Sequence, residues 1–230
     1  MSGRRSHTEE AVAKGAGVPA ASCRAASSCQ STAEAAGPDC LSPAEAAGLF
    51  RRLQEKMGIP KPELVAPTPF CFLVSVVLSA QATDKSVNAA TGPLYERVST
   101  PAQMLTLGEE GLIPYIRSIG LYNAKAKHII ELSRQLIEKF GGELPSTREE
   151  LMTLSGVGRK TANVVLNVIF HEPTMPVDTH VFRVCNRTGL APGKDVGAVE
   201  AALEGIVPAE YALHAHHWLL LHGRYVCTAR

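Results

Sequence analysis

Lys160 and Asp178 are two residues whose chemistry suits a nucleophile and its acid–base partner. Lys160 follows a Gly-Val-Gly turn (156–158) and Arg159, and it begins an apolar run typical of a helix. A lysine in the first turn of a helix is disfavoured by the helix dipole, and Arg159 adds like-charge repulsion. An ammonium destabilised in this way deprotonates more easily, and a neutral amine can attack an electrophilic sugar carbon or form a Schiff base. A lysine that binds phosphate is the alternative.

Asp178 precedes the helix-like segment VFRVCNR, and its position predicts an N-cap whose carboxylate accepts backbone N–H groups. A capping role and a catalytic role do not exclude each other. A carboxylate close to Lys160 could stabilise a positively charged, sugar-like transition state and accept a proton from the amine. The pair is therefore compatible with attack on the sugar carbon of a nucleoside, and a phosphate-binding lysine beside a capping aspartate is the alternative that stays open.

The segment LMTLSGVGRKTANVVLNVIF (151–170) predicts a helix-hairpin-helix motif. We expect Gly156 and Gly158 to take positive φ, so that backbone N–H groups face outward beside the start of the second helix and bind a phosphate. A Walker loop would need glycine in place of Leu154, and a dinucleotide-binding fingerprint would need a small residue in place of Thr161. A tight turn between two core helices is the alternative that stays open.

The elements around this motif are predicted to be helical throughout. Hydrophobic residues make up 45% of the chain and aromatic residues only 5%, a balance that favours packed helices over sheets. Residues 70–80 predict a buried central helix. Residues 124–140 predict an amphipathic surface helix with Ile137 on its inner stripe and Lys125 off it, ended by glycine. Residues 1–43 are too poor in large apolar side chains to fold and predict a disordered extension.

The charge and the cysteines of the chain narrow the classes of protein. A net charge of +1 gives no molecule-wide attraction for a polyanion, so a nucleic-acid site has to be local. No apolar run approaches the roughly 20 residues of a membrane span, and the N-terminus lacks the apolar core of a secretory signal. We expect a cytoplasmic protein with reduced thiols and no membrane partner.

Five segments resemble the endonuclease III family of helix-hairpin-helix DNA glycosylases. They are LSAQATD (78–84), SIGLYNAKA (118–126), LSGVGRKTANVVLN (154–167), VDTHVFRVCNRTG (177–189) and HHWLLLHGRYVC (216–227). The resemblance covers residues 41–230. It implies a monomeric base-excision repair enzyme that removes oxidised pyrimidines from double-stranded DNA and cleaves 3′ to the abasic site by β-elimination.

The resemblance also implies an all-α fold of two helical domains with the lesion cleft between them. A six-helix barrel would span residues 62–171 and contain the hairpin at about 149–170. The second domain would combine residues 44–61 with residues 172–230.

By the same resemblance, Lys160 is the Schiff-base lysine and Asp178 the catalytic aspartate. Gln81 would fill the stack vacated by the flipped nucleotide, and Leu121 would be an apolar wedge. The alternatives are a polar helix end for Gln81 and an inward-packing loop residue for Leu121. Further DNA contacts are expected from Gly156, Val157, Gly158, Arg159 and His180.

A departure from the family concerns iron. The family closes with a C-x6-C-x2-C-x5-C loop that holds a [4Fe-4S] cluster, and Cys227 is the one ligand matched here before the sequence stops at Arg230. We therefore expect a sequence truncated within the loop and little or no cluster. Cys23, Cys29 and Cys40 have the wrong spacing to substitute as ligands. The histidines at 214–222 lack a recognised zinc spacing and are expected to pack.

There are three other interpretations. A non-catalytic helix-hairpin-helix DNA-binding module would remain if the cluster loop were lost. A monofunctional adenine-type glycosylase is disfavoured because such relatives generally lack a lysine at the position of Lys160. A helical protein that never meets DNA is the third reading of the same pattern.

Overall fold

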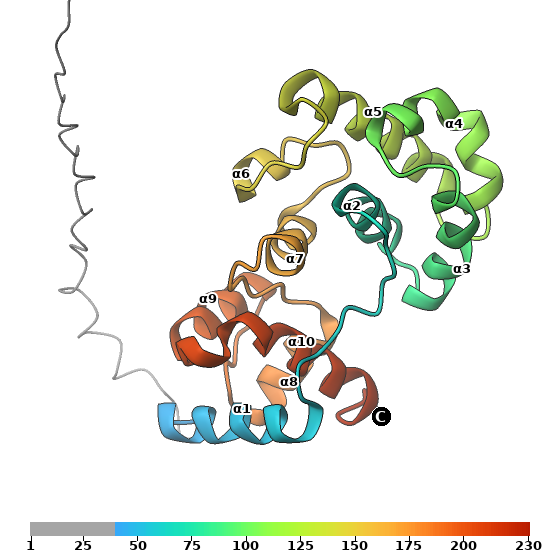
Figure 1. Ribbon diagram of the computed structural model, residues 1–230. Helices are drawn as coiled ribbons and strands as arrows, with labels where there is room; N and C mark the ends of the chain where they lie inside the picture. The colour runs from blue at the N-terminus through green and yellow to red at the C-terminus, as the bar shows by residue number, and fades with distance from the viewer. Residues whose placement is uncertain (1–39) are drawn as a thin grey trace, which may run out of the picture. The chain divides into compact units, whose positions relative to one another are not determined.

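The computed structural model of the chain describes residues 40–230 and folds them into helices joined by short loops, with no strand in that range (Figure 1). The predicted all-α class is confirmed. No helix of the described part is long and apolar enough to cross a membrane. The elements are α1 (Pro43–Met57), α2 (Pro69–Leu78), α3 (Asp84–Tyr95), α4 (Pro101–Ile116), α5 (Tyr122–Phe140), α6 (Arg148–Leu151), α7 (Arg159–Ile169), α8 (Thr179–Thr188), α9 (Val196–Ile206) and α10 (Ala209–Tyr225).

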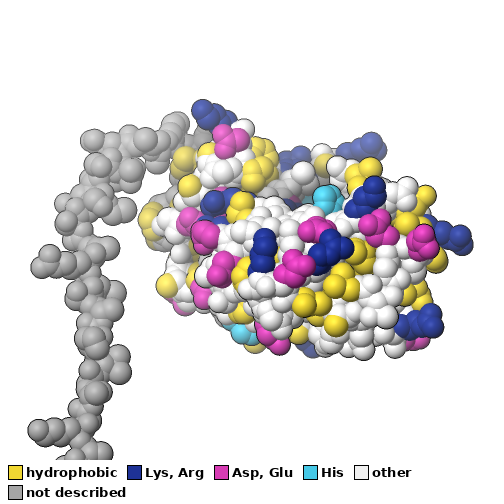
Figure 2. Space-filling view, turned by 90° about the horizontal axis from the view of Figure 1, so that it is seen from above, with side chains coloured by type: hydrophobic (Ala, Val, Ile, Leu, Met, Phe, Trp, Pro, Cys, Tyr) yellow, Lys and Arg dark blue, Asp and Glu magenta, His cyan; other side chains and the backbone are white. Residues whose placement is uncertain are grey.

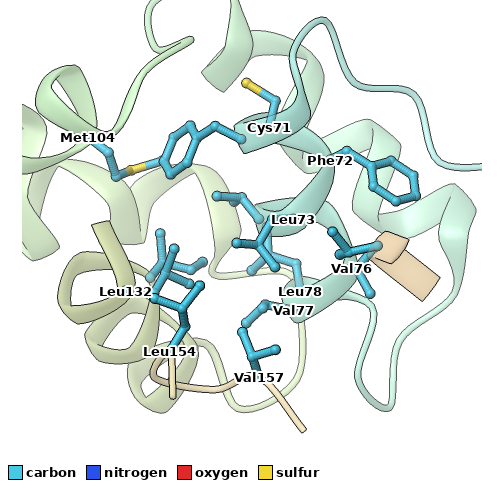
Figure 3. Close-up of a cluster of buried hydrophobic side chains, with 14 of the residues drawn as sticks. Cys71, Phe72, Leu73, Val76, Val77, Leu78, Met104, Leu132, Leu154 and Val157 are labelled. Carbon is cyan, nitrogen blue, oxygen red and sulfur yellow. The ribbon is translucent and has the colours of Figure 1, made fainter. Parts of the chain in front are cut away.

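A first hydrophobic cluster is built around α2, whose residues from Phe70 to Leu78 are all buried. Its other buried members come from α3 to α7 and the turns between them. Figure 3 shows Leu132 of α5, and Leu154 and Val157 of the hairpin, directed at this helix. The buried central helix predicted at 70–80 is confirmed, and the hairpin packs against it through Leu154 and Val157.

A second cluster joins the two ends of the described chain. Ala46 and Phe50 of α1 pack with buried residues of α8, α9 and α10, which lie beside α1 in Figure 1. The indole N–H of Trp218 donates to the carbonyl of Gly58 at 2.9 Å and ties α10 to the end of α1. Two clusters of this composition agree with the expected two-domain arrangement. The limits 62–171, 44–61 and 172–230 stay a prediction.

The start of the ordered chain differs slightly from the expectation. Residues 1–39 lie outside the described residues, so most of the extension predicted for 1–43 is not described. The folded part was predicted to begin at Ala44, but Ser42 already caps α1 in a capping box with Glu45. The amide of Leu41 also donates to the carbonyl of Gly189 at 2.8 Å. These bonds order the chain before the first helical turn.

Helix α5 confirms the predicted amphipathic helix, but two of its residues were assigned to the wrong side. Lys125 is only 5% exposed, whereas Ile137 is 39% exposed. The reason is that α5 packs against both α2 and α4, which rotates and widens its buried face. Gly141, with φ 63°, ends the helix as expected.

Candidate active site

The helix-hairpin-helix motif is formed by α6, a turn and α7. The Thr147 side chain accepts the amide of Glu150 and caps the first helix. Gly156 adopts φ 78°, as predicted for the turn. The prediction for Gly158 was wrong, because this residue is extended at φ −94° and ψ 175° and serves as the N-cap of α7. One left-handed residue is therefore enough to reverse the chain here.

Val157 does not have the free side chain or free amide of a DNA contact. Its side chain is 7% exposed within the first cluster, and its amide donates to the carbonyl of Leu154 at 3.1 Å. Both groups are engaged within the protein, and a DNA contact from Val157 stays a prediction. The N–H groups of the first turn of α7 have no intrahelical partners, so they are the ones that an anion could meet.

Arg159 is engaged within the protein. Its guanidinium donates to both carboxylate oxygens of Glu200 on α9, with Nη2 at 2.9 Å from Oε1. Asn163 Nδ2 donates to the same oxygen at 3.0 Å. The Arg159 side chain is still 55% exposed, so a DNA contact from it stays a prediction.

Lys160 and Asp178 line the same pocket, which encloses about 210 Å³. Lys160 is the second residue of α7, as predicted. Asp178 is the N-cap of α8, and its Oδ1 accepts the amides of His180 at 2.9 Å and Val181 at 2.8 Å. The predicted cap is confirmed. The structure thus brings the amine and the carboxylate to one cavity from two different helices.

An ion-pair network that sequence reasoning missed lines this pocket. Arg224 of α10 binds Asp84 of α3, with Nη1 2.6 Å from Oδ2, and also binds Glu63. The hydroxyl of Tyr225 donates to Glu63 Oε1 at 2.6 Å. Asp84 and Arg224 stand in two of the segments that carry the family resemblance, and this was the one sequence signal that could have pointed to the network. Glu63 stands in none of them.

His216 forms a buried part of the pocket wall. The Nδ1 atom of its ring has no hydrogen-bond partner among the described residues. Burial, followed by the charges of His217 and Lys160, lowers the pKa of His216 to about 3. The ring is therefore neutral at ordinary pH and offers an uncharged wall.

Gln81 and Leu121 lie in turns that begin at the ends of helices. Both are non-glycine residues with left-handed backbones, at φ 56° and 60°. Gln81 lines the pocket and is exposed, and Leu121 is 63% exposed. The alternative in which Leu121 packs inward is wrong.

His180 is half-buried beside the pocket, with its Nδ1 3.2 Å from Arg183 Nη2. The face seen in Figure 2 carries basic and acidic side chains interspersed, without one dominant basic patch.

Both the sequence and the structure of this chain match known DNA repair proteins. The sequence model of the HhH-GPD superfamily of base excision DNA repair proteins matches residues 74–209. Endonuclease III of Escherichia coli (strain K12) is 57% identical over 182 residues, which cover 79% of this chain and 86% of that protein. The chain belongs to the endonuclease III family. It is a DNA glycosylase of base excision repair.

Two further members of the family support the assignment. Endonuclease III of Haemophilus influenzae is 56% identical over 182 residues, covering 79% of this chain and 86% of that protein. A solved structure of an endonuclease III trapped as a covalent intermediate with DNA superposes with a TM-score of 0.78 at 43% identity. The superposition covers 83% of this chain and 90% of that one.

The family normally binds a [4Fe-4S] cluster, which four thiolates hold. Residues 40–230 contain four free cysteines, of which Cys71 and Cys185 are buried in different hydrophobic clusters. Burial raises the pKa of the Cys185 thiol to about 12, so this group stays protonated. No group of three or more metal-binding side chains is found in the described part. These residues do not fit the cluster. Cys23 and Cys29 lie outside the described residues.

Proposed function

We propose that this member of the endonuclease III family is a bifunctional enzyme that acts as a monomer on double-stranded DNA. It removes oxidised pyrimidines and then cleaves the strand 3′ to the abasic site. The observation that carries the proposal is that Lys160 and Asp178 line one pocket although 18 positions separate them. Its volume of about 210 Å³ lies below the roughly 300–1,000 Å³ of pockets for drug-sized ligands. A single extruded base is a suitable occupant.

The chemistry follows from the two groups. The Lys160 amine attacks carbon one of the sugar, and a bond from nitrogen to carbon forms as the glycosidic bond breaks and the base leaves with its electron pair. Asp178 stabilises the positive charge of the transition state and accepts the proton that the nitrogen loses. Ring opening gives the Schiff base, and loss of a proton from the adjacent sugar carbon expels the 3′ phosphate.

The groups at the rim suit a flipped nucleotide. Gln81 and Leu121 would occupy the stack that the base leaves, as inserted side chains do in kinked duplexes. Gly156, Gly158 and the first amides of α7 would bind a backbone phosphate beside Lys160. His180 would contact the strand from the start of α8. These roles are carried over residue by residue from the family resemblance.

Borohydride trapping on duplex DNA with one abasic site tests the proposal. Wild-type protein should form a covalent adduct, and Lys160→Gln should lose it while keeping salt-sensitive binding. Lys61→Gln is the matched control, because Lys61 lines the same pocket and should not be the nucleophile. Trapping that survives in Lys160→Gln and disappears in Lys61→Gln would reassign the nucleophile. A wild-type chain that binds but never traps would indicate a non-catalytic DNA-binding module.

We also propose that residues 40–230 do not by themselves hold a [4Fe-4S] cluster, because the described part contains no group of three or more metal-binding side chains and Cys227 is the single residue there that is matched to the ligand loop. Cys227 lies beside Arg187, with Nη1 3.7 Å from Sγ, rather than among other thiols. The test is the visible absorbance of the purified protein together with an iron count per chain. About four irons per chain, the content of one such cluster, would overturn this part of the proposal.

A further inference from the structure

Lys125 is a buried cation that the chemistry above does not use. It is 5% exposed on α5, and its Nζ donates to the carbonyls of Leu78 at 2.9 Å and Ala80 at 2.7 Å. Neither partner is a carboxylate. Burial lowers the pKa of Lys125, and the two carbonyls are what the ammonium receives in place of water.

The two carbonyls belong to the end of α2 and the turn that follows it. Leu78 is the last residue of α2, and Ala80 directly precedes Gln81. Carbonyls at a helix C-terminus lack intrahelical partners and carry partial negative charge, so a cation there is favourable. Lys125 therefore caps α2 from a helix more than 40 residues further along the chain.

The main chain of the same residue is bonded to a second turn, the one that contains Leu121. The amide of Lys125 donates to the carbonyl of Leu121 at 3.0 Å, in the first turn of α5. Leu121 and Gln81 both have left-handed backbones, which side-chain-bearing residues adopt only when their surroundings hold them there. One lysine thus contacts both turns, through its side chain on one side and its main chain on the other.

This contact joins two of the segments that carry the family resemblance. LSAQATD supplies the two carbonyls, and SIGLYNAKA supplies the lysine. The exposed side chains of the two turns, Gln81 and Leu121, are the ones proposed above to enter the duplex. Their relative position has to be fixed if both are to enter one stack.

We propose that Lys125 is a positioning residue that sets the spacing of the Gln81 and Leu121 turns, so that both side chains insert into the duplex in one step. This inference rests on the proposed insertion by these residues. It does not involve the chemistry at Lys160. Loss of Lys125 should therefore impair the opening of duplex DNA and leave the reaction with an already extruded sugar intact.

The experiment compares Lys125→Met, which keeps the apolar stem and removes the donors, with Lys127→Met on the exposed side of the same helix. Single-turnover cleavage is measured on an abasic site in duplex and in single-stranded DNA. Lys125→Met should slow duplex cleavage roughly tenfold or more, the effect expected from lost charged hydrogen bonds, without slowing single-strand cleavage. Lys127→Met should change neither rate.

A double-mutant cycle separates positioning from general stability. If Lys125 acts through the Leu121 turn, Lys125→Met combined with Leu121→Ala should be no slower on duplex than the slower single variant. Equal slowing on both DNAs, no slowing on duplex, or additive effects in the cycle would overturn the proposal. If Lys125→Met fails to fold, as judged by thermal melting, Lys125→Gln retains one donor group and should show the same duplex selectivity in weaker form.

A binding measurement keeps this inference distinguishable from the proposed lyase function. A 2-aminopurine opposite a stable abasic analogue brightens when its stacking is disrupted. In a Lys160→Gln background, which cannot react, Lys125→Met should reduce this increase at saturating protein and Lys127→Met should not. Absence of trapping by wild-type protein would refute the lyase proposal alone, and an unchanged fluorescence increase would refute the role of Lys125 alone.

Discussion

Arg159 and Glu200 form a two-pronged ion pair that joins the first residue of α7 to α9. Nε lies 3.1 Å from each carboxylate oxygen, and Nη2 lies 2.9 Å from Oε1. The Glu200 side chain is 6% exposed, whereas that of Arg159 is 55% exposed. Because the pair sits one residue from Lys160, it fixes the helix end that carries the amine.

Arg159→Met should lower the free energy of unfolding, because it leaves the Glu200 carboxylate buried with Asn163 as its remaining side-chain donor. The half-exposed guanidinium limits the loss to about 1 kcal/mol. Urea denaturation measures it. Arg51→Met, at the exposed pair with Glu55, is the control and should have no measurable effect. If Arg159 also contacts a DNA phosphate, the plot of the logarithm of the binding constant against the logarithm of salt concentration should be shallower for Arg159→Met than for wild type, by about one unit of slope.

The double role of Asp178 can be separated by two substitutions. Asparagine caps helices nearly as well as aspartate but carries no charge. Asp178→Asn should therefore keep the melting temperature of wild type and slow base removal by roughly 10²- to 10⁴-fold. Asp178→Ala should lose activity and, in addition, about 1 kcal/mol of stability from the lost cap at α8. Full activity in Asp178→Asn would show that the carboxylate serves only as a cap.

The two glycines of the hairpin should differ in their tolerance of alanine. At Gly156, φ is 78° and a Cβ would lie 3.0 Å from the Cβ of His128. Gly156→Ala should therefore destabilise the fold by roughly 1–2 kcal/mol. Gly158 is extended and has no atom within 4 Å of such a Cβ, so Gly158→Ala should fold normally.

DNA binding by Gly158→Ala then reports on the turn itself. A methyl group that blocks a phosphate should weaken duplex binding without changing the melting temperature. Unchanged affinity would place the phosphate elsewhere. Equal destabilisation by the two alanine variants would contradict the backbone argument.

The sequence predicted local structure well wherever one periodicity or one cap decides it. The buried helix α2, the glycine that ends α5 and the cap at Asp178 all follow from such local signals. The meeting of Lys160 and Asp178 in one pocket was accessible only through the family resemblance, because helix spacing says nothing about contacts between helices.

Apart from Gly158, whose error concerns its own backbone conformation, the main errors share one physical cause, which is contact with a distant element. Lys125 was assigned to the solvent side because a lysine is seldom buried, and only the carbonyls at the end of α2 make its burial acceptable. The ion pair of Arg159 was not foreseen, because its partner, Glu200, stands 41 positions away. The Arg224 network was missed for the same reason, since Glu63 is 161 positions from it.

Buried His216 should make the stability of the fold depend on pH. Its folded pKa of about 3 lies below the ordinary value of 6.5, so between these values the unfolded chain binds more protons than the folded one. The stability from a neutral His216 is complete above pH 6.5 and is lost as the pH falls toward 3. With these two pKa values, the free energy of unfolding should fall by about 2 kcal/mol between pH 7 and pH 5.

The variant that checks this dependence is His216→Gln, because glutamine keeps a polar side chain with donors and cannot titrate. Urea denaturation at pH 7 and pH 5 should show a smaller loss of stability in His216→Gln than in wild type. His128→Gln, on the exposed surface of α5, should follow the wild-type pH dependence. An identical loss in all three proteins would show that other groups control the acid sensitivity and that His216 is accessible to protons in the folded state.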